Sequence, residues 1–468
     1  MKKTFLTKLI AIIAVIALVA GVMSGCGKKV NDKDEEGRTI ISVNEYPDKE
    51  GPERDAYDLK IEKFEADNPD VKVNPDMWKF EIQTFYAKAA GNQLPNVFRT
   101  YFTEAGQCRN SGYSTDITDA LDKHGYKVLL NEKVSDVVTE EGRIYGLPIN
   151  PYLLCLAFNT EMLEAAGLME ADGTPKQPKT WDEVVEFAKK IKDATGKPGF
   201  AFPTAETTGG WIFTNLAWSF GVDFMEQDAN GKWKATFNSP EAEAALQWVK
   251  DLKWKHDIIP SNTLLNHNEY HKTFATGGAA MIVTPGDVPR KVVQYGMTPE
   301  QLGMMALPAG PARHVTLLGG SVLQVASSST EDQVDAAVRW IGSLHGHQLT
   351  EAAKAELDAD IDKKITENWL IGPKTLNAWK DSTERVAYQN ELIDKNTNAN
   401  PNHYRLYNEF LESDVEVQPE EPVCAQDLYR TLDNCIQEVL TNKDADCAQV
   451  LEKACADFQA NYLDNLTY

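Results

Sequence analysis

The stretch HNEYH brings three potential metal ligands together, namely His267, Glu269 and His271. Two imidazoles four residues apart lie on one face of a helix, a spacing that can hold zinc. No further ligand is evident nearby, and an isolated pair of histidines does not complete a zinc site. We therefore favour polar side chains on a solvated helix face over a metal centre.

A second polar spacing, Asp358, Asp360 and Asp362, resembles the opening of a calcium-binding loop. Such a loop requires glycine at its sixth position and a glutamate at its twelfth. Lys363 stands at the sixth position and no glutamate closes the loop. We expect a solvated helix face here as well, and neither a metal nor a cofactor in this protein.

Sequence motifs of catalysis are missing. The chain has no phosphate-binding G-x-x-x-x-G-K-[ST], no nucleophile elbow G-x-S-x-G and no H-E-x-x-H. A secreted hydrolase stays open as an alternative, because 70 acidic residues could place two carboxylates at glycosidase separation in any fold. Nothing specific supports hydrolysis, so we expect a protein that is not an enzyme.

What remains is an excess of aromatic residues beside polar ones, at predicted strand ends and in loops. Sugars suit such surfaces, since their C–H faces pack on aromatic rings and their hydroxyls need donors and acceptors in fixed positions. Aromatic residues also build cores. Trp218 and Trp248, at helical spacing, are better explained by core packing.

The elements that position these residues begin with a β-α-β-α-β alternation. Strands are predicted at Thr39–Val43, Val71–Val73 and Val97–Tyr101. The helix between the first two carries Tyr57, Ile61 and Phe64 on one face and ends at Asn68, and the next helix is expected over 81–90. This pattern predicts a parallel sheet covered on both faces, with a binding crevice at the carboxyl ends of its strands.

The stretch YGLPINPYLLCLAFNTEMLEAAGL, Tyr145 to Leu168, combines a broken backbone, a short apolar strand and a helix start. Pro148 and Pro151 cannot donate to a strand ladder, so they suit a segment crossing between lobes better than a central strand. An ordinary loop, strand and helix within one domain is the alternative. LPAGPAR, Leu307 to Arg313, is the predicted second crossing.

The first crossing resembles that of the extracellular solute-binding proteins of ABC transporters, family 1, the sugar-type group, in which G-L-P precedes a strand ending in F/Y-N. Similar motifs follow in the family's order: PKTWDEVVEFAKKI, FATGGAAMIVTP and LLGGSVLQVASSSTEDQVDAAVRWIGSL. The resemblance covers roughly Arg38 to the C-terminus. It implies an α/β fold, a two-lobe clamshell like that of periplasmic binding proteins, each lobe a mostly parallel sheet flanked by helices.

The implied domain division has two discontinuous lobes. Residues 38–150 with about 312–365 form the first lobe, and residues 151–311 with about 366–468 form the second. The resemblance also implies a monomer that captures an oligosaccharide or similar polyhydroxylated solute and delivers it to the permease subunits of an ABC importer. Alternatives are a binding protein for peptides or small cations, and a receptor that serves a sensor kinase.

The family's cleft is lined by segments that match several places in this chain. The loop at Gly286 lacks the tryptophan that many members carry there and has Asp287 instead, which leaves the ligand class open among sugars, peptides and small cations. The ligand-binding residues implied by the resemblance are Glu45, Tyr46, Trp78, Tyr101, Asn150, Tyr152, Glu206, Trp211, Asp287, Gly320, Tyr404 and Arg405.

Trp211 is the residue we expect to be a main contact as the lobes close on the ligand. It follows Gly209 and Gly210, which would let the backbone turn tightly and present the ring. In the alternative, Trp211 begins a helix with Phe213 and Leu216 and packs inward.

The N-terminus reads as a bacterial lipoprotein signal. Lys2, Lys3 and Lys8 precede an uncharged apolar run from Leu9 to Val22, and Cys26 follows small residues, as in a lipobox. We expect residues 1–25 to be the signal peptide, Cys26 to be acylated and residues 26–37 to form a flexible tether. A plain secretory signal is the alternative. The expected location is the outer face of the cell membrane, held by the lipid anchor.

The chain is strongly acidic, with a formal net charge of −23. Such a field disfavours nucleic acid and polyphosphates as partners. The six cysteines beyond Cys26 include Cys424, Cys435, Cys447 and Cys455 in the last helical segment. Outside the cell, we expect at least one disulfide within this group, with four buried thiols as the alternative.

Overall fold

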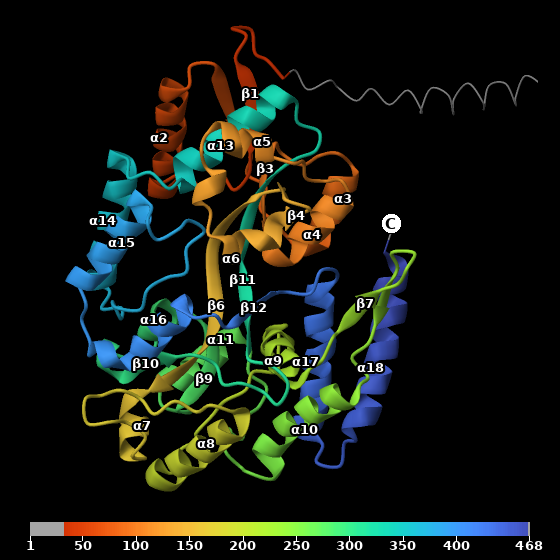
Figure 1. The fold of residues 1–468 in the computed structure, drawn as a ribbon, viewed down its shortest axis with the longest axis vertical. Coiled ribbons are helices and arrows are strands. Elements are labelled where there is room, and N and C mark those ends of the chain that lie inside the picture. Colours follow the sequence, from red (N-terminus) through yellow and green to blue (C-terminus); the bar gives the residue numbers. More distant parts are fainter. Residues whose placement is uncertain (1–31, 467–468) are drawn as a thin grey trace, which may run out of the picture.

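The computed structural model describes residues 32–466, and its long axis follows two strands that run through most of the molecule (Figure 1). Among the described residues the main sheet has eight strands in the order β10-β6-β11-β3-β1-β2, with β9 on β6 and β12 on β11. The strands are β1 (Thr39–Val43), β2 (Val71–Pro75), β3 (Val97–Tyr101), β4 (Thr139–Glu140), β5 (Arg143–Ile144), β6 (Leu147–Asn159), β7 (Met225–Gln227), β8 (Trp233–Ala235), β9 (Met281–Pro285), β10 (Leu302–Met305), β11 (Val315–Val325) and β12 (Glu416–Pro419).

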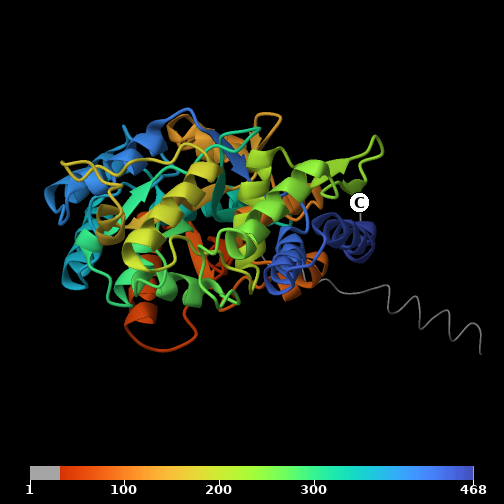
Figure 2. The same cartoon turned by 90° about the horizontal axis from the view of Figure 1, so that it is seen from below.

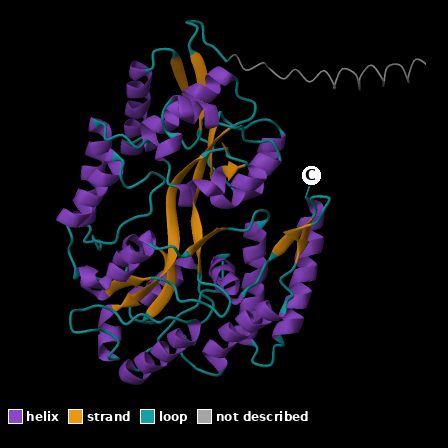
Figure 3. Cartoon of the chain, in the orientation of Figure 1, coloured by secondary structure: helices purple, strands orange, loops and turns teal. Residues whose placement is uncertain are grey.

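Helices cover both faces of this sheet (Figure 3). We call the end of the molecule that holds β1, β2 and β3 the first lobe, and the end that holds β9 and β10 the second lobe. The helices are α2 (Pro52–Asp67), α3 (Ile82–Ala90), α4 (Phe102–Asn110), α5 (Thr118–Lys123), α6 (Glu132–Ser135), α7 (Thr160–Ala165), α8 (Trp181–Thr195), α9 (Thr208–Phe220), α10 (Pro240–Trp254), α11 (His267–Ala275), α12 (Val288–Val293), α13 (Glu331–His345), α14 (Glu351–Thr366), α15 (Glu384–Lys395), α16 (Arg405–Glu412), α17 (Ala425–Thr441) and α18 (Cys447–Asn461).

The first lobe confirms the predicted alternation. β1 pairs in parallel with β2 and with β3, and Ile41 and Val43 point into the core while their neighbours are partly exposed. Helix α2 ends with Asn68 as its C-cap and buries Ile61 and Phe64, as its apolar spacing predicts. The carboxyl ends of β1 and β3 therefore lie at one edge, facing the second lobe.

The second lobe departs from the expected parallel arrangement. β9 and β10 both pair antiparallel with β6, on its two sides. β11 also runs antiparallel to β3 and to β6. The expectation of a mostly parallel sheet is therefore wrong for this lobe. A single long strand extends from the first lobe into the second, and its new neighbours pair with it in the antiparallel direction.

That strand is β6, which runs unbroken through Pro148 and Pro151. Pro148 lies opposite Val322 in the ladder with β11, so the prediction that the prolines avoid a central strand is wrong. Pro151 lies where the pairing is interrupted, because the register with β11 shifts between Gly319 and Ser321 and the neighbouring Asn150 adopts a left-handed φ of 49°. The chain does cross between lobes here, but as a kinked strand.

The second crossing was predicted at Leu307 to Arg313, and this is wrong. The backbone of that loop is tied to the second lobe, since Ala309 N–H donates to Lys179 O and Ala312 N–H donates to Ser219 O. The crossing is made by β11, which follows the loop. β12 then adds in parallel to the start of β11 and leads into α17.

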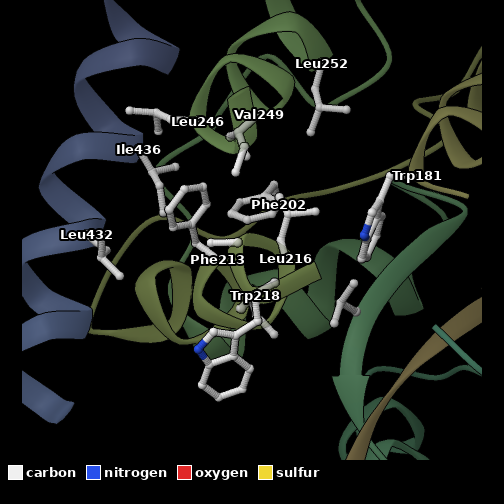
Figure 4. Close-up of a cluster of buried hydrophobic side chains, with 14 of the residues drawn as sticks. Trp181, Phe202, Phe213, Leu216, Trp218, Leu246, Val249, Leu252, Leu432 and Ile436 are labelled. Atoms are coloured by element: carbon white, nitrogen blue, oxygen red, sulfur yellow. The ribbon is translucent and has the colours of Figure 1, made fainter. Parts of the chain in front are cut away.

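The largest cluster of buried side chains lies in the second lobe, where α9, α10 and α17 meet (Figure 4). Phe213 and Leu216 of α9 face Leu246 and Val249 of α10 there, and Trp218 points to the other side of α9, where it donates to Glu421. Trp218 is fully buried, which confirms its expected place in the core, whereas Trp248 is only partly buried. Seen from below, α17 and α18 form one side of the molecule beside α10 and the hairpin β7–β8 (Figure 2). This packing fixes α9, which presents Trp211.

The predicted signal peptide and Cys26 lie outside the described residues. Of the predicted tether, residues 32–37 form a turn against the first lobe: Lys33 bridges to Thr39 and makes an ion pair with Asp332 at 2.6 Å, and Arg38 pairs with Asp34. Within 32–466 no helix is long and apolar enough to cross a membrane.

The expected C-terminal disulfide is not formed. Cys108, Cys155, Cys424, Cys435, Cys447 and Cys455 are all free thiols in the described part of the chain. Cys435 donates to Thr431 O at 3.4 Å, and Cys447 to Gln247 Oε1 at 3.5 Å, so these thiols have protein partners other than each other. Noncovalent packing therefore holds α17 and α18 against α10.

Candidate functional site

The register of the sheet gathers the predicted site residues at one level between the lobes. Ser321 of β11 lies opposite Tyr101 of β3 on one side and Ile149 of β6 on the other. Tyr152 lies opposite Gly319. Both crossing strands are distorted here, with Asn150 at φ 49° and Gly320 at φ 157°. The end of β3 and the internal residues of β6 and β11 therefore present their side chains around a shared kink.

Tyr152 and Trp211 form an aromatic corner at this level. Their ring centroids lie 6.1 Å apart, with the planes at 86°. A Cβ on Gly319 would lie 2.3 Å from the Tyr152 ring, so the glycine makes room for the phenol. Both rings are partly exposed, and the Tyr152 hydroxyl has no hydrogen bond to any residue within 32–466. The corner therefore keeps a face and a hydroxyl available.

A carboxyl group completes this corner. Glu420, just after β12, accepts a hydrogen bond from the Tyr429 hydroxyl at 2.9 Å, and Trp211 supplies a second donor. Burial raises the pKa of Glu420 to about 7 despite these donors, and the nearby Glu104 carboxyl adds to the increase. Burial also raises the pKa of Tyr152, with further contributions from Glu420 and Asp287.

Asp287 lies beside Tyr152, since β9 ends two residues earlier and pairs with β6. Its side chain is exposed to solvent, yet the surrounding protein still raises its pKa. The adjacent Gly286 is needed for close approach, because a Cβ there would meet the Tyr407 hydroxyl at 2.1 Å.

The first lobe contributes a fixed polar layer. Glu45, at φ 66°, faces Arg99 at 3.3 Å, and Arg99 donates to Ser321 Oγ at 2.8 Å. The Glu45 amide donates to the carbonyl of Trp78, whose ring stacks on Phe85. Tyr46 turns toward α2 instead and donates to Asp58 at 2.7 Å.

Helix α9 owes its position to Asp433 of α17. The Asp433 carboxylate accepts from the amides of Thr207 at 2.6 Å and Gly210 at 2.8 Å, at the start of α9. The predicted tight turn at Gly209 and Gly210 is wrong, because both lie within the first turn of the helix. They are small because α17 comes close: a Cβ on Gly210 would meet Tyr429 O at 2.0 Å.

Trp211 lies in the first turn of α9, near where the inward-packing alternative began a helix. Phe213 is buried, as that alternative supposed, but Trp211 stays partly exposed beside Tyr152. Glu206 is exposed just before α9 and accepts from Asn266 at 3.3 Å. Among the described residues, Glu206 forms no hydrogen bond with Tyr152 or Trp211.

Tyr404 and Arg405 lie elsewhere. Tyr404 is 3% exposed and packs where a Cβ on Gly372 would come within 2.1 Å of its ring. Arg405 is exposed at the start of α16 and faces Glu409 at 3.6 Å. The residue of this segment that does reach the site is Tyr407, through Gly286. The residue near the site is therefore Tyr407, three residues after the expected Tyr404.

The two metal-like spacings are used by the protein itself. The expected solvated face is wrong for His271, which is 2% exposed, with one ring nitrogen 2.7 Å from His267 O and the other 2.9 Å from Thr284 Oγ1. Asp358 accepts from the Tyr388 hydroxyl at 2.6 Å. Within the described residues, no cluster of three or more ligand side chains could hold a metal ion.

Sequence reasoning missed Glu420, Tyr429, Tyr407 and Arg99. Glu420 follows Pro419 and precedes Glu421 and Pro422, a loop pattern that carries no local sign of a binding site. Adjacent carboxyls before a helix could have indicated capping, yet α17 has no side-chain cap. Only the return of the chain along β12 brings them to the crossing.

Comparison with known proteins finds a family model, described as bacterial extracellular solute-binding protein, that matches residues 50–345. The sn-glycerol-3-phosphate-binding periplasmic protein UgpB of Brucella melitensis is 25% identical over 388 residues, which is 78% of this chain and 82% of that protein. The lactose-binding protein of Rhizobium radiobacter is 26% identical over 310 residues, covering 62% of this chain and 66% of that protein.

Solved structures share the fold over nearly the whole chain. Maltose-bound MalE3 of T. maritima has a TM-score of 0.63 and 23% sequence identity, covering 90% of this chain and 99% of that one. The cyclic alpha-maltosyl-1,6-maltose binding protein of Arthrobacter globiformis has a TM-score of 0.64 and 20% identity, covering 92% of this chain and 100% of that one. At these identities the likeness shows the fold alone.

Proposed function

Because the chain belongs to the bacterial extracellular solute-binding protein family, whose members bind solutes and are not enzymes, we propose that it captures an oligosaccharide or similar polyhydroxylated solute for an ABC importer. The solute would lie between the two lobes and pass to the permease subunits. The protein would act as a monomer. Its relatives include proteins named for lactose and sn-glycerol-3-phosphate, and its structural neighbours one bound to maltose.

The observation that carries this proposal is the aromatic corner of Tyr152 and Trp211 with Glu420 beside it. A sugar ring needs an aromatic face for its C–H surface and convergent polar groups for its hydroxyls. The two rings supply the face, and the Tyr152 hydroxyl and the Glu420 carboxyl supply polar atoms. Across the crossing, the ion pair of Glu45 with Arg99 adds a fixed polar layer.

A small organic cation is the second candidate. Within 32–466, Glu420 and Asp287 form no ion pair, although both lie near aromatic rings; the charges of Lys291 and Arg290 act on Asp287 from further away and lower its pKa against the effect of burial. Rings and carboxylates together suit an ammonium group. This candidate rests on the same corner and differs from the first only in the charge of the ligand.

We further propose that the lobes rotate about the level of Asn150 and Gly320, where both crossing strands leave regular geometry. The residues assigned above, 38–150 with about 312–365 and 151–311 with about 366–468, would then move as two bodies. Part of the helical segment after 366 stays with the first body, since Asn131 and Leu130 bond to the backbone around Trp379. Lipid attachment at Cys26 would hold the protein at the outer face of the membrane.

A thermal-shift screen tests the ligand class. The panel is maltose, maltotriose, lactose, sn-glycerol-3-phosphate, spermidine and a dipeptide. A ligand that binds only the folded protein raises its stability by about 2.7 kcal/mol at a hundred times its Kd. We expect a saturable increase in midpoint with one of the sugars. An increase confined to spermidine would support the cation, and one confined to the dipeptide or the phosphate would contradict both candidates.

A further inference from the structure

Two adjacent glutamates between β12 and α17 face opposite environments. Glu421 is 7% exposed and accepts a hydrogen bond from Trp218 Nε1 at 2.9 Å, inside the core of the second lobe. Glu420 turns the other way, toward Tyr429, Trp211 and the level of Tyr152, and keeps part of its surface exposed. The same chemical group therefore serves as a core partner at one position and reaches the candidate site at the next.

The hydrogen bonds of Glu420 leave room for more. A carboxylate offers about four lone-pair positions. Tyr429 and Trp211 occupy two of them from the protein side. No lysine or arginine of residues 32–466 forms an ion pair with this carboxyl. Two acceptor positions thus remain on a group that is held in place by aromatic donors and open on one side.

From this geometry we propose that Glu420 is a specificity-determining residue that accepts paired hydrogen bonds from two neighbouring hydroxyls of the solute. The inference rests on the proposed function of sugar binding and names the group that would orient the sugar. Trp211 and Tyr152 would pack on the faces of the sugar ring, while Glu420 would bind the hydroxyls at its edge. Tyr429 is a positioning residue, because it is 1% exposed and acts by holding the carboxyl.

Protonation gives this role a distinct signature. The groups that face Glu420 are Tyr429 from α17, Trp211 from α9, Tyr152 from β6 and Glu104 from α4, and none of them is basic. A pKa of about 7 means that the carboxyl gains a proton as the pH falls through neutrality. The protonated form accepts less well, so affinity for the sugar should fall between about pH 8 and pH 6.

The test compares Glu420→Gln with the matched control Glu421→Gln, using the sugar of the maltose, maltotriose and lactose panel that binds the unchanged protein best. Titration calorimetry at pH 6 and pH 8 gives the affinities. A lost charged hydrogen bond costs about tenfold to a hundredfold in affinity. We expect that loss at pH 8 for Glu420→Gln and little change for Glu421→Gln. We also expect the pH dependence to disappear only in Glu420→Gln.

Tyr429→Phe supplies a second variant, which keeps the ring and removes the donor to Glu420. It should lower affinity by a smaller factor and move the midpoint of the pH dependence upward, because the ionised carboxyl loses a stabilising donor. Equal effects of Glu420→Gln and Glu421→Gln would mean a structural role and overturn the inference, while sugar binding survives. Failure of all three sugars to bind the unchanged protein would overturn the proposed function and this inference together.

Discussion

The Tyr152 ring fills the space beside Gly319, where a Cβ would come within 2.3 Å of the ring. Gly319→Ala should therefore push Tyr152 away from Trp211. Overpacking of this kind costs about 1–3 kcal/mol of stability. We expect affinity for the sugar to fall by more than tenfold in protein that is still folded, because the aromatic corner is lost. Calorimetry with circular dichroism on the same samples measures both effects.

Gly106→Ala is the matched control, since a Cβ at that helical position meets no atom nearer than 3.9 Å. It should leave affinity unchanged and leave stability equal or higher by about 0.5–1 kcal/mol. Unaltered sugar affinity in Gly319→Ala would show that Tyr152 does not contact the ligand.

Trp211→Ala tests the other ring of the corner. Losing an indole stacked on a ligand should cost on the order of 2 kcal/mol of binding free energy, or roughly thirtyfold in affinity. Trp248→Ala is a suitable comparison, because Trp248 is also partly buried but packs against Trp181 at 5.4 Å, away from the crossing. That variant should lose stability without losing affinity. Similar losses of affinity in both would assign Trp211 to the core.

Whether a contact can be predicted from the sequence depends on how far apart its residues lie along the chain. Patterns within one element were enough for β1 to β3 and for the buried residues and the end of α2. The resemblance named Tyr152 and Trp211, whose rings the structure brings together. Glu420 could not be found, because its partners Trp211 and Tyr152 lie more than 200 residues earlier and meet it only in the fold.

The prolines of β6 show a second limit. Missing N–H groups predicted a break in the strand, but Pro148 stays in the ladder opposite Val322 and Pro151 lies at the register shift between Gly319 and Ser321. The sequence shows that a proline lacks an N–H group, but the pairing with the neighbouring strand determines whether this interrupts the sheet. The same holds for Gly209 and Gly210, which serve contact with α17 rather than a turn.

The buried Glu421 makes stability depend on pH with an uncommon sign. Burial raises its pKa to about 7 from 4.5, so the folded protein holds a proton that the unfolded chain releases. The stabilising contribution is complete below about pH 4.5 and is lost as the pH rises through about 7. Glu421→Gln, which resembles the neutral acid, should therefore be more stable than the unchanged protein at pH 8 and similar at pH 5. Urea unfolding at both pH values measures this, and an equal or lower stability of the variant at pH 8 would argue against a buried neutral carboxyl.

Lipid attachment is tested at Cys26. Cells given a labelled fatty acid should incorporate it into the protein and retain the protein with membranes. The two chains of a diacylglyceryl group make such anchoring stable, whereas a single chain binds only marginally. Cys26→Ala should lose both the label and the membrane fraction. Label that persists in Cys26→Ala would rule out acylation at this residue.

The most direct measurement is equilibrium dialysis of the protein against maltose, maltotriose and lactose, followed by chemical analysis of the recovered sugar. A solute-binding protein should take up one molecule per chain, saturably, and return it unchanged. We predict this for at least one of the three sugars, with uptake abolished by unfolding. No saturable uptake of any of them, or recovery of cleaved sugar, would contradict the account.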